Sequence, residues 1–358
     1  MTMTSATPPI APLFEGPLDI VGDVHGEVEV LESLLSYLGY DAQGDSADGR
    51  RLVFLGDLID RGPDSPAVVD KVMSLVGNGK AQCLMGNHEL NILLNRPLPG
   101  NGWLIQPNHL ENPGEFRSRP VDPEKLQDYL QFFSSLPLAL ENESLRLTHA
   151  CWHAQSVAQL REPAYSELSI TDLYRRFDDA ALQEIHASGL QAALDDEVRQ
   201  YGVALEDPEW QARLLPAHAK AEVLRHMWNP VRVLTTSEVR AGPKPFFIVG
   251  LWRMIERTRW WDYYDDDIPV VIGHFWRRFS AASERISGIF GRDVFEGIPT
   301  HAWMGKRKNV YCVDYSVGQL HAERRRDPDP VEFHGKLAAL RYPEWEVHHH
   351  DGTVIPVV

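Results

Sequence analysis

The fold is decided by the stretch Leu18-Asp-Ile-Val-Gly-Asp-Val-His-Gly26. It begins with a short apolar run, 18–21, and ends in a polar cluster that contains Asp23 and His25. Apolar residues then recur at helical spacing over 28–38, which predicts an amphipathic helix directly after the cluster. The order of strand, polar cluster and helix is typical of an α/β protein.

The same order occurs twice more along the chain. Leu52-Val-Phe-Leu55 leads into the polar block Gly56-Asp-Leu-Ile-Asp-Arg-Gly-Pro63. Ala81-Gln-Cys-Leu-Met85 leads into Gly86-Asn-His-Glu89. Chemistry in α/β sheets collects at the carboxyl ends of the strands, where all three polar clusters lie. We therefore expect the three clusters to form one site.

Further strands are predicted in the second half of the chain. Apolar runs at 144–148 and 268–272 end in His149 and His274, respectively. A third run, 309–313, is followed by an aspartate. Two more histidines are thus expected at strand ends.

Capping and turn residues predict several boundaries. A helix is expected from Ser65, with Ser65 as its N-cap and Pro66 at its first position. Another is expected over 122–133, and Asp351-Gly352 predicts a hairpin near the C-terminus.

Charge and composition exclude several classes of function. The 358 residues include 35 basic and 51 acidic side chains, and the net charge of −16 disfavours broad binding of nucleic acid or of an anionic membrane. Three cysteines without a CxxC pair are typical of free thiols in a reducing compartment. Residues 1–15 lack the features of a signal peptide and are expected to form a flexible arm. We expect a cytoplasmic protein, since no apolar run approaches the ~20 residues that span a bilayer.

The side chains of the polar clusters are suited to bind metal. Carboxylate, amide and imidazole ligands together favour Mn, Fe, Zn or similar ions over Ca or Cu(I). A carboxylate has two oxygens and can bridge two ions, and two ions roughly 3.5–4 Å apart form a clamp for displacement at phosphorus. The candidate ligands are Asp23, His25, Asp57, Asn87, His149 and His274.

The three blocks Gly22-Asp-Val-His-Gly26, Gly56-Asp-Leu-Ile-Asp-Arg-Gly62 and Gly86-Asn-His-Glu89 resemble the signatures of the phosphoprotein phosphatase (PPP) family. That family and the bacterial diadenosine tetraphosphatases belong to the calcineurin-like metallophosphoesterases. His149-Ala150 resembles the later His-Gly block, with alanine in place of glycine, and Gly273-His274 resembles the final Gly-His block. The resemblance implies an α/β sandwich of two mixed β-sheets flanked by helices.

The resemblance also implies a role for each residue. Asp23 and His25 bind the first metal, Asp57 bridges both, and Asn87, His149 and His274 bind the second. Two divalent ions are implied, Mn²⁺ in preference to Fe, Zn, Ni or Mg, and a hydroxide that bridges them attacks the phosphorus. His88 protonates the leaving oxygen, Asp60 orients His88, and Arg61 holds the phosphoryl oxygens.

A second phosphate-binding arginine is implied between the two late histidines. Arg253 is the first choice, and the other candidates are Arg257, Arg259 and Arg277. Asp314 and Tyr315 fall where the family places residues that close the site. We interpret His153 as a loop residue and the run 348–350 as a solvated strand end, because consecutive strand residues face opposite sides. For the tryptophans near 252–276, core packing is the default interpretation.

Residues 155–235 interrupt the family pattern. His149 and His274 are 125 residues apart, and the intervening region is acidic and helix-patterned, with helices expected near 179–200 and 208–228. We interpret 155–235 as a helical insertion, either a cap over the site or a dimer surface. The catalytic domain is then 16–154 together with 236–358.

The leading functional prediction is hydrolysis of phosphomonoesters with serine/threonine phosphatase-like chemistry. The alternative is a diadenosine tetraphosphate or nucleoside polyphosphate hydrolase, since the same site can act on either bond. A third hypothesis, from another class, is a non-catalytic binding protein that retains its metals, although the Asp60–His88 pair argues against it. The expected substrate is a phosphorylated protein or a small phosphorylated or nucleotide compound, with no nucleic acid or membrane partner, and the oligomeric state stays open.

Overall fold

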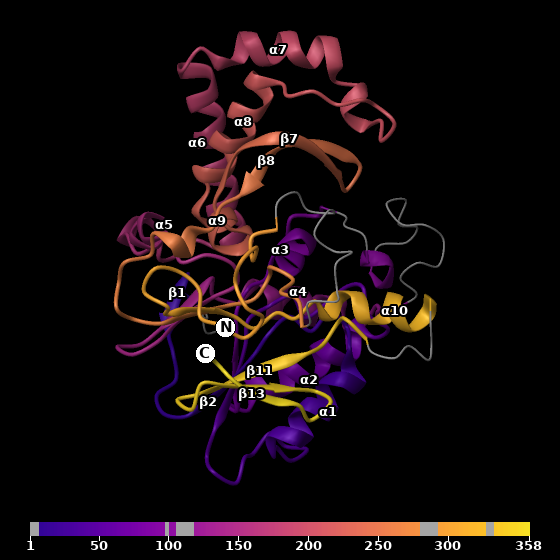
Figure 1. Cartoon of the computed structure of the whole chain (residues 1–358), viewed down its shortest axis with the longest axis vertical. Coiled ribbons are helices and arrows are strands. Elements are labelled where there is room, and N and C mark those ends of the chain that lie inside the picture. Colours follow the sequence, from indigo (N-terminus) through magenta and orange to yellow (C-terminus); the bar gives the residue numbers. More distant parts are fainter. Residues whose placement is uncertain (1–6, 97–99, 105–117, 280–292, 327–332) are drawn as a thin grey trace.

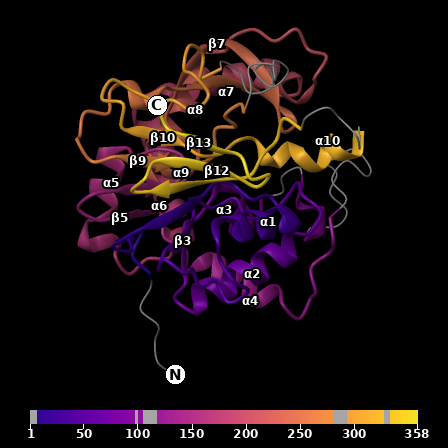
Figure 2. The ribbon, with the colours of Figure 1, turned by 60° about the horizontal axis from the view of Figure 1, so that its bottom comes forward.

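The computed structural model describes residues 7–96, 100–104, 118–279, 293–326 and 333–358 (Figure 1). Within these ranges, two large mixed sheets lie face to face with helices on their outer sides (Figure 2). This arrangement confirms the predicted α/β sandwich. A two-stranded sheet and several helices stand apart at the top of Figure 1.

The six-stranded sheet contains the stretch that opens the sequence. Its parallel half is β2, β3 and β4, and its antiparallel half is β11, β12 and β13, joined where β11 pairs with β2. All four residues of β2 are buried, as expected for a central strand covered on both faces. The strands are β2 (Leu18–Val21), β3 (Arg51–Phe54), β4 (Ala81–Cys83), β11 (Ala338–Tyr342), β12 (Glu346–His349) and β13 (Val354–Pro356).

The five-stranded sheet has the order β1-β5-β6-β9-β10. Apolar side chains from both sheets form one cluster between them, for example Ile20 and Val53 from one sheet and Leu147 and Val271 from the other. Burial of this interleaved layer holds the two sheets together. The strands are β1 (Ile10–Pro12), β5 (Ala139–Glu141), β6 (Arg146–Thr148), β9 (Val270–Ile272) and β10 (Val310–Cys312).

Helices cover the outer faces of both sheets. The predicted helix at 28–38 is confirmed as α1, whose apolar stripe is buried. Helix α2 begins at Ser65 as predicted, but its N-cap is Asp64, whose carboxylate accepts the Ala67 N–H at 2.9 Å. The helices around the sandwich are α1 (Val28–Leu38), α2 (Ser65–Gly77), α3 (Asn87–Leu93), α4 (Leu126–Ser134), α5 (Ala154–Leu160), α9 (Pro230–Thr236) and α10 (Leu320–Arg326), with short 3₁₀ turns η1 (Asn101–Trp103), η2 (Pro163–Tyr165), η4 (Trp260–Asp262) and η5 (Val317–Gln319).

A separate layer, here called the cover, consists of α6 (Ile170–Ala187), α7 (Leu190–Tyr201), α8 (Pro216–Met227), β7 (Val239–Ile248) and β8 (Leu251–Arg257), with the short turn η3 (Ala204–Glu206) (Figure 1). The helix expected near 179–200 is divided at Gly189, which has φ +71°. The cover also extends beyond the predicted boundary at 235. Met254 of β8 packs with Ala219 of α8 in a small apolar cluster, so the β7–β8 hairpin belongs to this layer rather than to the sandwich.

The two ends of the chain differ in their agreement with the prediction. Residues 1–6 of the expected flexible arm lie outside the described ranges. Residues 10–12 are β1, paired in parallel with β5, and Leu13 is buried, so this part of the arm belongs to the sheet. The hairpin predicted at Asp351-Gly352 is confirmed by the antiparallel pair β12 and β13. Among the described helices, none combines the length and the hydropathy needed to cross a bilayer.

Candidate active site

The predicted ligands meet at one edge of the two sheets. Each follows the carboxyl end of a strand, and the loops that carry them are brought together because β2, β3 and β4 are parallel and β6 and β9 are parallel in the opposing sheet. Asp23 and His25 follow β2, Asp57 follows β3, Asn87 and His88 follow β4, His149 follows β6, and His274 follows β9.

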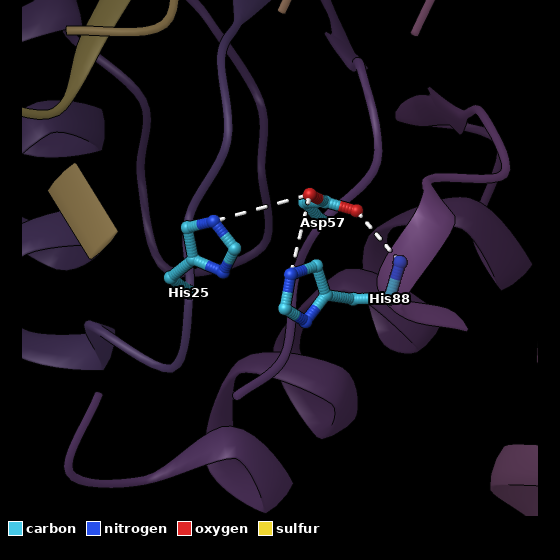
Figure 3. A group of neighbouring side chains, drawn as sticks. All are labelled: His25, Asp57 and His88. Atoms are coloured by element: carbon cyan, nitrogen blue, oxygen red, sulfur yellow. Dashed lines mark hydrogen bonds and ion pairs between the residues drawn. The ribbon is translucent and has the colours of Figure 1, made fainter. Parts of the chain in front are cut away.

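One group of possible metal ligands is His25, Asp57 and His88 (Figure 3). The Oδ2 atom of Asp57 lies 3.9 Å from Nε2 of His25 and 3.9 Å from Nε2 of His88. The backbone N–H of His88 donates to Oδ1 of Asp57 at 3.0 Å. Asp23 faces the same nitrogen of His25, with 3.8 Å between its Oδ2 and His25 Nε2.

A second group shares the same aspartate. Asp57, His149 and His274 offer ligand atoms within 4.8 Å of one another. His149 Nε2 is 3.4 Å from Asp57 Oδ2 and 3.3 Å from the amide oxygen of Asn87. Asp57 is therefore the one residue common to these two groups.

Backbone carbonyls set the orientation of two imidazoles. Nδ1 of His25 bonds to the Ile59 carbonyl at 2.9 Å, and Nδ1 of His149 bonds to the Leu55 carbonyl at 2.7 Å. A carbonyl can only accept, so Nδ1 carries a proton and Nε2 faces the site, where it would offer its lone pair to an ion. The turns are also strained, because His25, Asp57 and His274 have φ values of 48°, 49° and 69°.

Unpaired buried atoms test whether the residues fit metal ions. Among the described residues, Asp23 Oδ2, His25 Nε2 and His274 Nε2 are buried and have no hydrogen-bond partner. A buried polar atom without a partner is costly, and a cation removes that cost. Imidazole nitrogens and carboxylate oxygens are the ligands of transition metals such as Mn, Fe and Zn. The residues therefore fit two divalent ions.

Negative charge is crowded around this point. Burial and the neighbouring Asp314 raise the pKa of Asp23 well above its ordinary value. Burial would also raise the pKa of Asp57, but the adjacent His149 and His88 rings outweigh it and lower that pKa well below its usual range. Burial raises the pKa of Asp314 to about 6, although the Trp276 and Ser316 N–H groups donate to its carboxylate at 2.7 and 2.8 Å. Such crowded carboxylates favour the arrival of positive charge.

His88 and Asp60 lie against each other beside the candidate metal ligands. His88 Nδ1 lies 2.5 Å from Oδ2 of Asp60, and Nε2 of the same ring lies 3.3 Å from Nη2 of Arg61. The Arg61 guanidinium is 4.4 Å from the centroid of the Trp276 ring, which gives it a cation–π contact. His88 thus turns one nitrogen to Asp60 and the other to the site.

The candidates for the second phosphate-binding arginine have different neighbours. Arg253, the first choice, makes an ion pair with Glu222 of α8 at 3.2 Å. Arg257, at the end of β8, lies 5.6 Å from the Phe275 ring, next to His274. Burial and the charge of Arg61 lower the pKa of Arg257 to about 10, against the opposing charges of Asp314, Asp57 and Asp23.

The two remaining arginine candidates have structural partners. Arg259 pairs with Asp262 at 3.1 Å. Arg277 is buried and donates to the carbonyls of Cys312, Pro299 and Ala302. Arg257 is therefore the candidate whose charge lies among those of the site.

Two neighbours of the site did not come from the motif analysis. Glu89 accepts the backbone N–H groups of Asp57 at 3.0 Å, Leu58 at 2.8 Å and Gly86 at 3.1 Å, and so joins two ligand loops. Gly318 of η5 lies so close to the site that a methyl group there would meet His25 Cδ2 at 2.7 Å. Glu89 is the last residue of the block Gly86-Asn-His-Glu89, so its position could have indicated a role. No sequence pattern pointed to Gly318.

Several other predicted residues lie elsewhere. His153 is the N-cap of α5 and accepts the Ser156 N–H at 3.3 Å, in agreement with its interpretation as a loop residue. His349 is fully buried beside Phe279, so the run 348–350 is not simply a solvated strand end. The hydroxyl of Tyr315 shares a hydrogen bond of 2.7 Å with that of Tyr311 inside the sandwich, whereas the charge of Asp314 acts on Asp23.

Comparison with known proteins agrees with this site. The model of the calcineurin-like phosphoesterase family matches residues 16–199, so the chain belongs to that family of metal-dependent phosphoric ester hydrolases. The resemblance inferred from the three blocks is confirmed.

Curated relatives carry a more specific name. A bis(5'-nucleosyl)-tetraphosphatase PrpE (asymmetrical) of Oceanobacillus iheyensis is 34% identical over 140 residues, which are 37% of this chain and 55% of that protein. The protein of the same name from Bacillus subtilis is 30% identical over 148 residues, 39% of this chain and 60% of its own length. The chain thus matches a little over half the length of these relatives. A solved cold-active protein-tyrosine phosphatase of Shewanella shares 15% identity and a TM-score of 0.45, over 99% of this chain and 83% of its own.

Proposed function

We propose that the protein is a metal-dependent hydrolase of dinucleoside tetraphosphates. The observation that carries the proposal is the pair of ligand groups that share Asp57, in a chain whose curated relatives are named for that activity. The sequence favoured phosphomonoesters, but those relatives support the alternative substrate class instead. Hydrolysis of phosphomonoesters is kept as an outcome of the test.

The metal-binding residues act through position and charge. Asp23 and His25 would hold one ion, Asn87, His149 and His274 would hold the other, and Asp57 would be shared by both groups. Bound divalent ions, with Mn²⁺ favoured, supply Lewis acidity and a water molecule of lowered pKa. The carbonyl bonds to His25 and His149 keep both Nε2 atoms directed into the site before any ion arrives.

Three further side chains act on the polyphosphate. Arg61 and Arg257 bind phosphoryl oxygens, a task for which planar guanidinium groups are suited. His88 gives the proton on Nε2 to the leaving oxygen, and Asp60 holds the opposite nitrogen, Nδ1. The site therefore supplies charge, orientation and one proton.

The cover is proposed as a cap and not as a dimer surface. Its hairpin ends at Arg257, whose charge interacts with Asp57 and Asp23, so the cover itself contributes to the phosphate-binding part of the site. A layer that both supplies this arginine and stands beside the strand ends can limit the size of substrate that enters.

The decisive experiment compares substrates with Mn²⁺ added. We expect diadenosine tetraphosphate to be cleaved asymmetrically to ATP and AMP, with kcat/KM at least about tenfold above that for p-nitrophenyl phosphate or a phosphoserine peptide. Product identity is read by anion-exchange chromatography. A preference for the phosphomonoesters would restore the phosphatase function, and binding of metal without turnover of any substrate would leave only the non-catalytic hypothesis.

A further inference from the structure

The carboxylate of Asp60 has two donors besides His88. Asn101 Nδ2 donates to Oδ2 at 2.6 Å, the same oxygen that faces His88 Nδ1 at 2.5 Å. Trp103 Nε1 donates to Oδ1 at 2.6 Å. The backbone N–H of Asp60 donates to Ser65 Oγ at 2.9 Å. Both carboxylate oxygens and the main chain of Asp60 are therefore restrained at once.

Asn101 and Trp103 both come from η1, a segment that the family blocks do not contain. Asn101 is fully buried and Trp103 is 1% exposed. The turn lies directly against the Asp60–Arg61 backbone, because a methyl group on Gly100 would meet the Arg61 nitrogen at 2.6 Å. Gly100 has φ +97°, a conformation that glycine adopts without strain. The segment is thus built to approach the Asp60 turn closely.

We propose that Asn101 and Trp103 are positioning residues that hold Asp60 in the one orientation in which it aligns His88 for proton transfer. The inference rests on the proposed function, because it assumes that His88 donates the proton. A carboxylate that accepts from His88 alone can rotate about its last side-chain bond. With Trp103 on one oxygen and Asn101 on the other, rotation breaks two short hydrogen bonds in a buried site. His88 Nε2 consequently stays directed towards Asp57 and Arg61.

A purely structural role is the competing explanation, since buried indole and amide groups need acceptors wherever they lie. The chain offers a matched control for it. Trp261 is also buried, at 0% exposed, and within the described part of the chain its Nε1 has no hydrogen-bond partner. Trp261→Phe therefore removes a buried indole but no hydrogen bond to Asp60. Trp103→Phe removes a buried indole and its hydrogen bond to Asp60.

The leaving-group dependence separates the two explanations. Nitrophenolate leaves without much protonation, whereas phenolate is more basic and needs the acid. We expect Trp103→Phe to lower kcat about tenfold for phenyl phosphate and less than about threefold for p-nitrophenyl phosphate, with metal content unchanged. Asn101→Ala should shift the ratio of the two rates in the same direction. Trp261→Phe should change both rates by the same factor.

A double-mutant cycle shows whether the effect passes through His88. In the His88→Asn background, Trp103→Phe should lower kcat no further, because there is no longer an imidazole to align. An equal tenfold loss in both backgrounds would overturn the inference. The inference is also overturned if Trp103→Phe changes both rates by the same factor, as Trp261→Phe should, while His88→Asn shows the leaving-group effect. In that case the proposed function stands. If His88→Asn itself shows no such effect, the proposed role of His88 fails and the inference fails with it.

A spectroscopic measurement tests the geometry without turnover. In Zn²⁺-loaded protein, the Nδ1 proton between His88 and Asp60 should give a far-downfield NMR signal that is absent in His88→Asn. Trp103→Phe and Asn101→Ala should each move that signal upfield, and Trp261→Phe should leave it in place. A signal that Trp103→Phe and Asn101→Ala leave unmoved would show that the two residues do not position Asp60.

Discussion

The strand-end site and the cover hold their charged groups in different ways. In the site, Asp57 is 2% exposed and its backbone is tied to Glu89, while its carboxylate accepts the His88 N–H. In the cover, the pair Arg199–Asp196 has side chains 74% and 72% exposed. An exposed pair of this kind contributes about 0–1 kcal/mol, whereas a buried charge that loses its partners costs several. Substitutions should therefore be severe in the first region and mild in the second, except where the cover reaches the site.

The largest effect is expected at Asp57, the residue shared by both ligand groups. Asp57→Asn removes the negative charge that faces His149 and His25, so activity should fall by at least about 10³-fold and metal content should drop. Steady-state kinetics and metal analysis of the purified variant measure this. Asp172→Asn, an exposed carboxylate of the cover, is the control and should retain both.

The next prediction concerns two arginines on the same strand of the cover. Arg257→Ala should lower kcat/KM about 10²-fold because it removes a half-buried positive charge that interacts with the carboxylates of the site. Arg253→Ala removes an ion pair with Glu222 and should change kcat/KM less than about threefold. If Arg253→Ala lowered kcat/KM more than Arg257→Ala, Arg253 would be the phosphate-binding arginine, and Arg257 would not.

A smaller effect on metal binding is expected at Gly318, whose backbone packs directly against His25. Gly318→Ala places a methyl group 2.7 Å from His25 Cδ2 and should displace the imidazole, which weakens metal binding by roughly tenfold. Isothermal titration with Mn²⁺ measures the change. Gly77→Ala, where a methyl group meets nothing within 4 Å, should bind metal as the wild type does.

The last prediction is a pH effect confined to the cover. Burial and the charge of Arg232 lower the pKa of His226 from its ordinary 6.5 to about 3, and its Nε2 donates to the Ser237 carbonyl at 2.7 Å. The unfolded chain takes up this proton below pH 6.5 and the folded one does not, so the stabilisation is complete above pH 6.5 and declines as pH falls towards 3. Between pH 7 and pH 4.5 the decline should be roughly 2.5 kcal/mol.

Urea unfolding of His226→Gln tests this sign. The variant should lose less stability than the wild type between the two pH values, because its amide does not titrate. His186→Gln, at an exposed position of α6, should follow the wild type. A decline in His226→Gln as steep as in the wild type would assign the pH dependence to other groups.

Much of the site could be predicted because its residues belong to short blocks. Asp23, His25 and His88 each lie a fixed number of residues after a strand, so local sequence determines the side of the sheet they reach. A residue that only packing brings to the site, such as Gly318, was missed. Arg253 and Arg257 belong to the same strand, and only the packing of the hairpin on α8 determines that Arg253 faces Glu222.

The sequence by itself therefore determined the α/β sandwich, the family and the six candidate metal ligands, because alternating strands and polar turns are local patterns. The tertiary structure alone decided that β1 belongs to the sheet, that the cover includes β7 and β8, and that Asn101 and Trp103 reach Asp60. These are contacts between segments far apart in the chain, and no local pattern specifies which buried donor meets which acceptor.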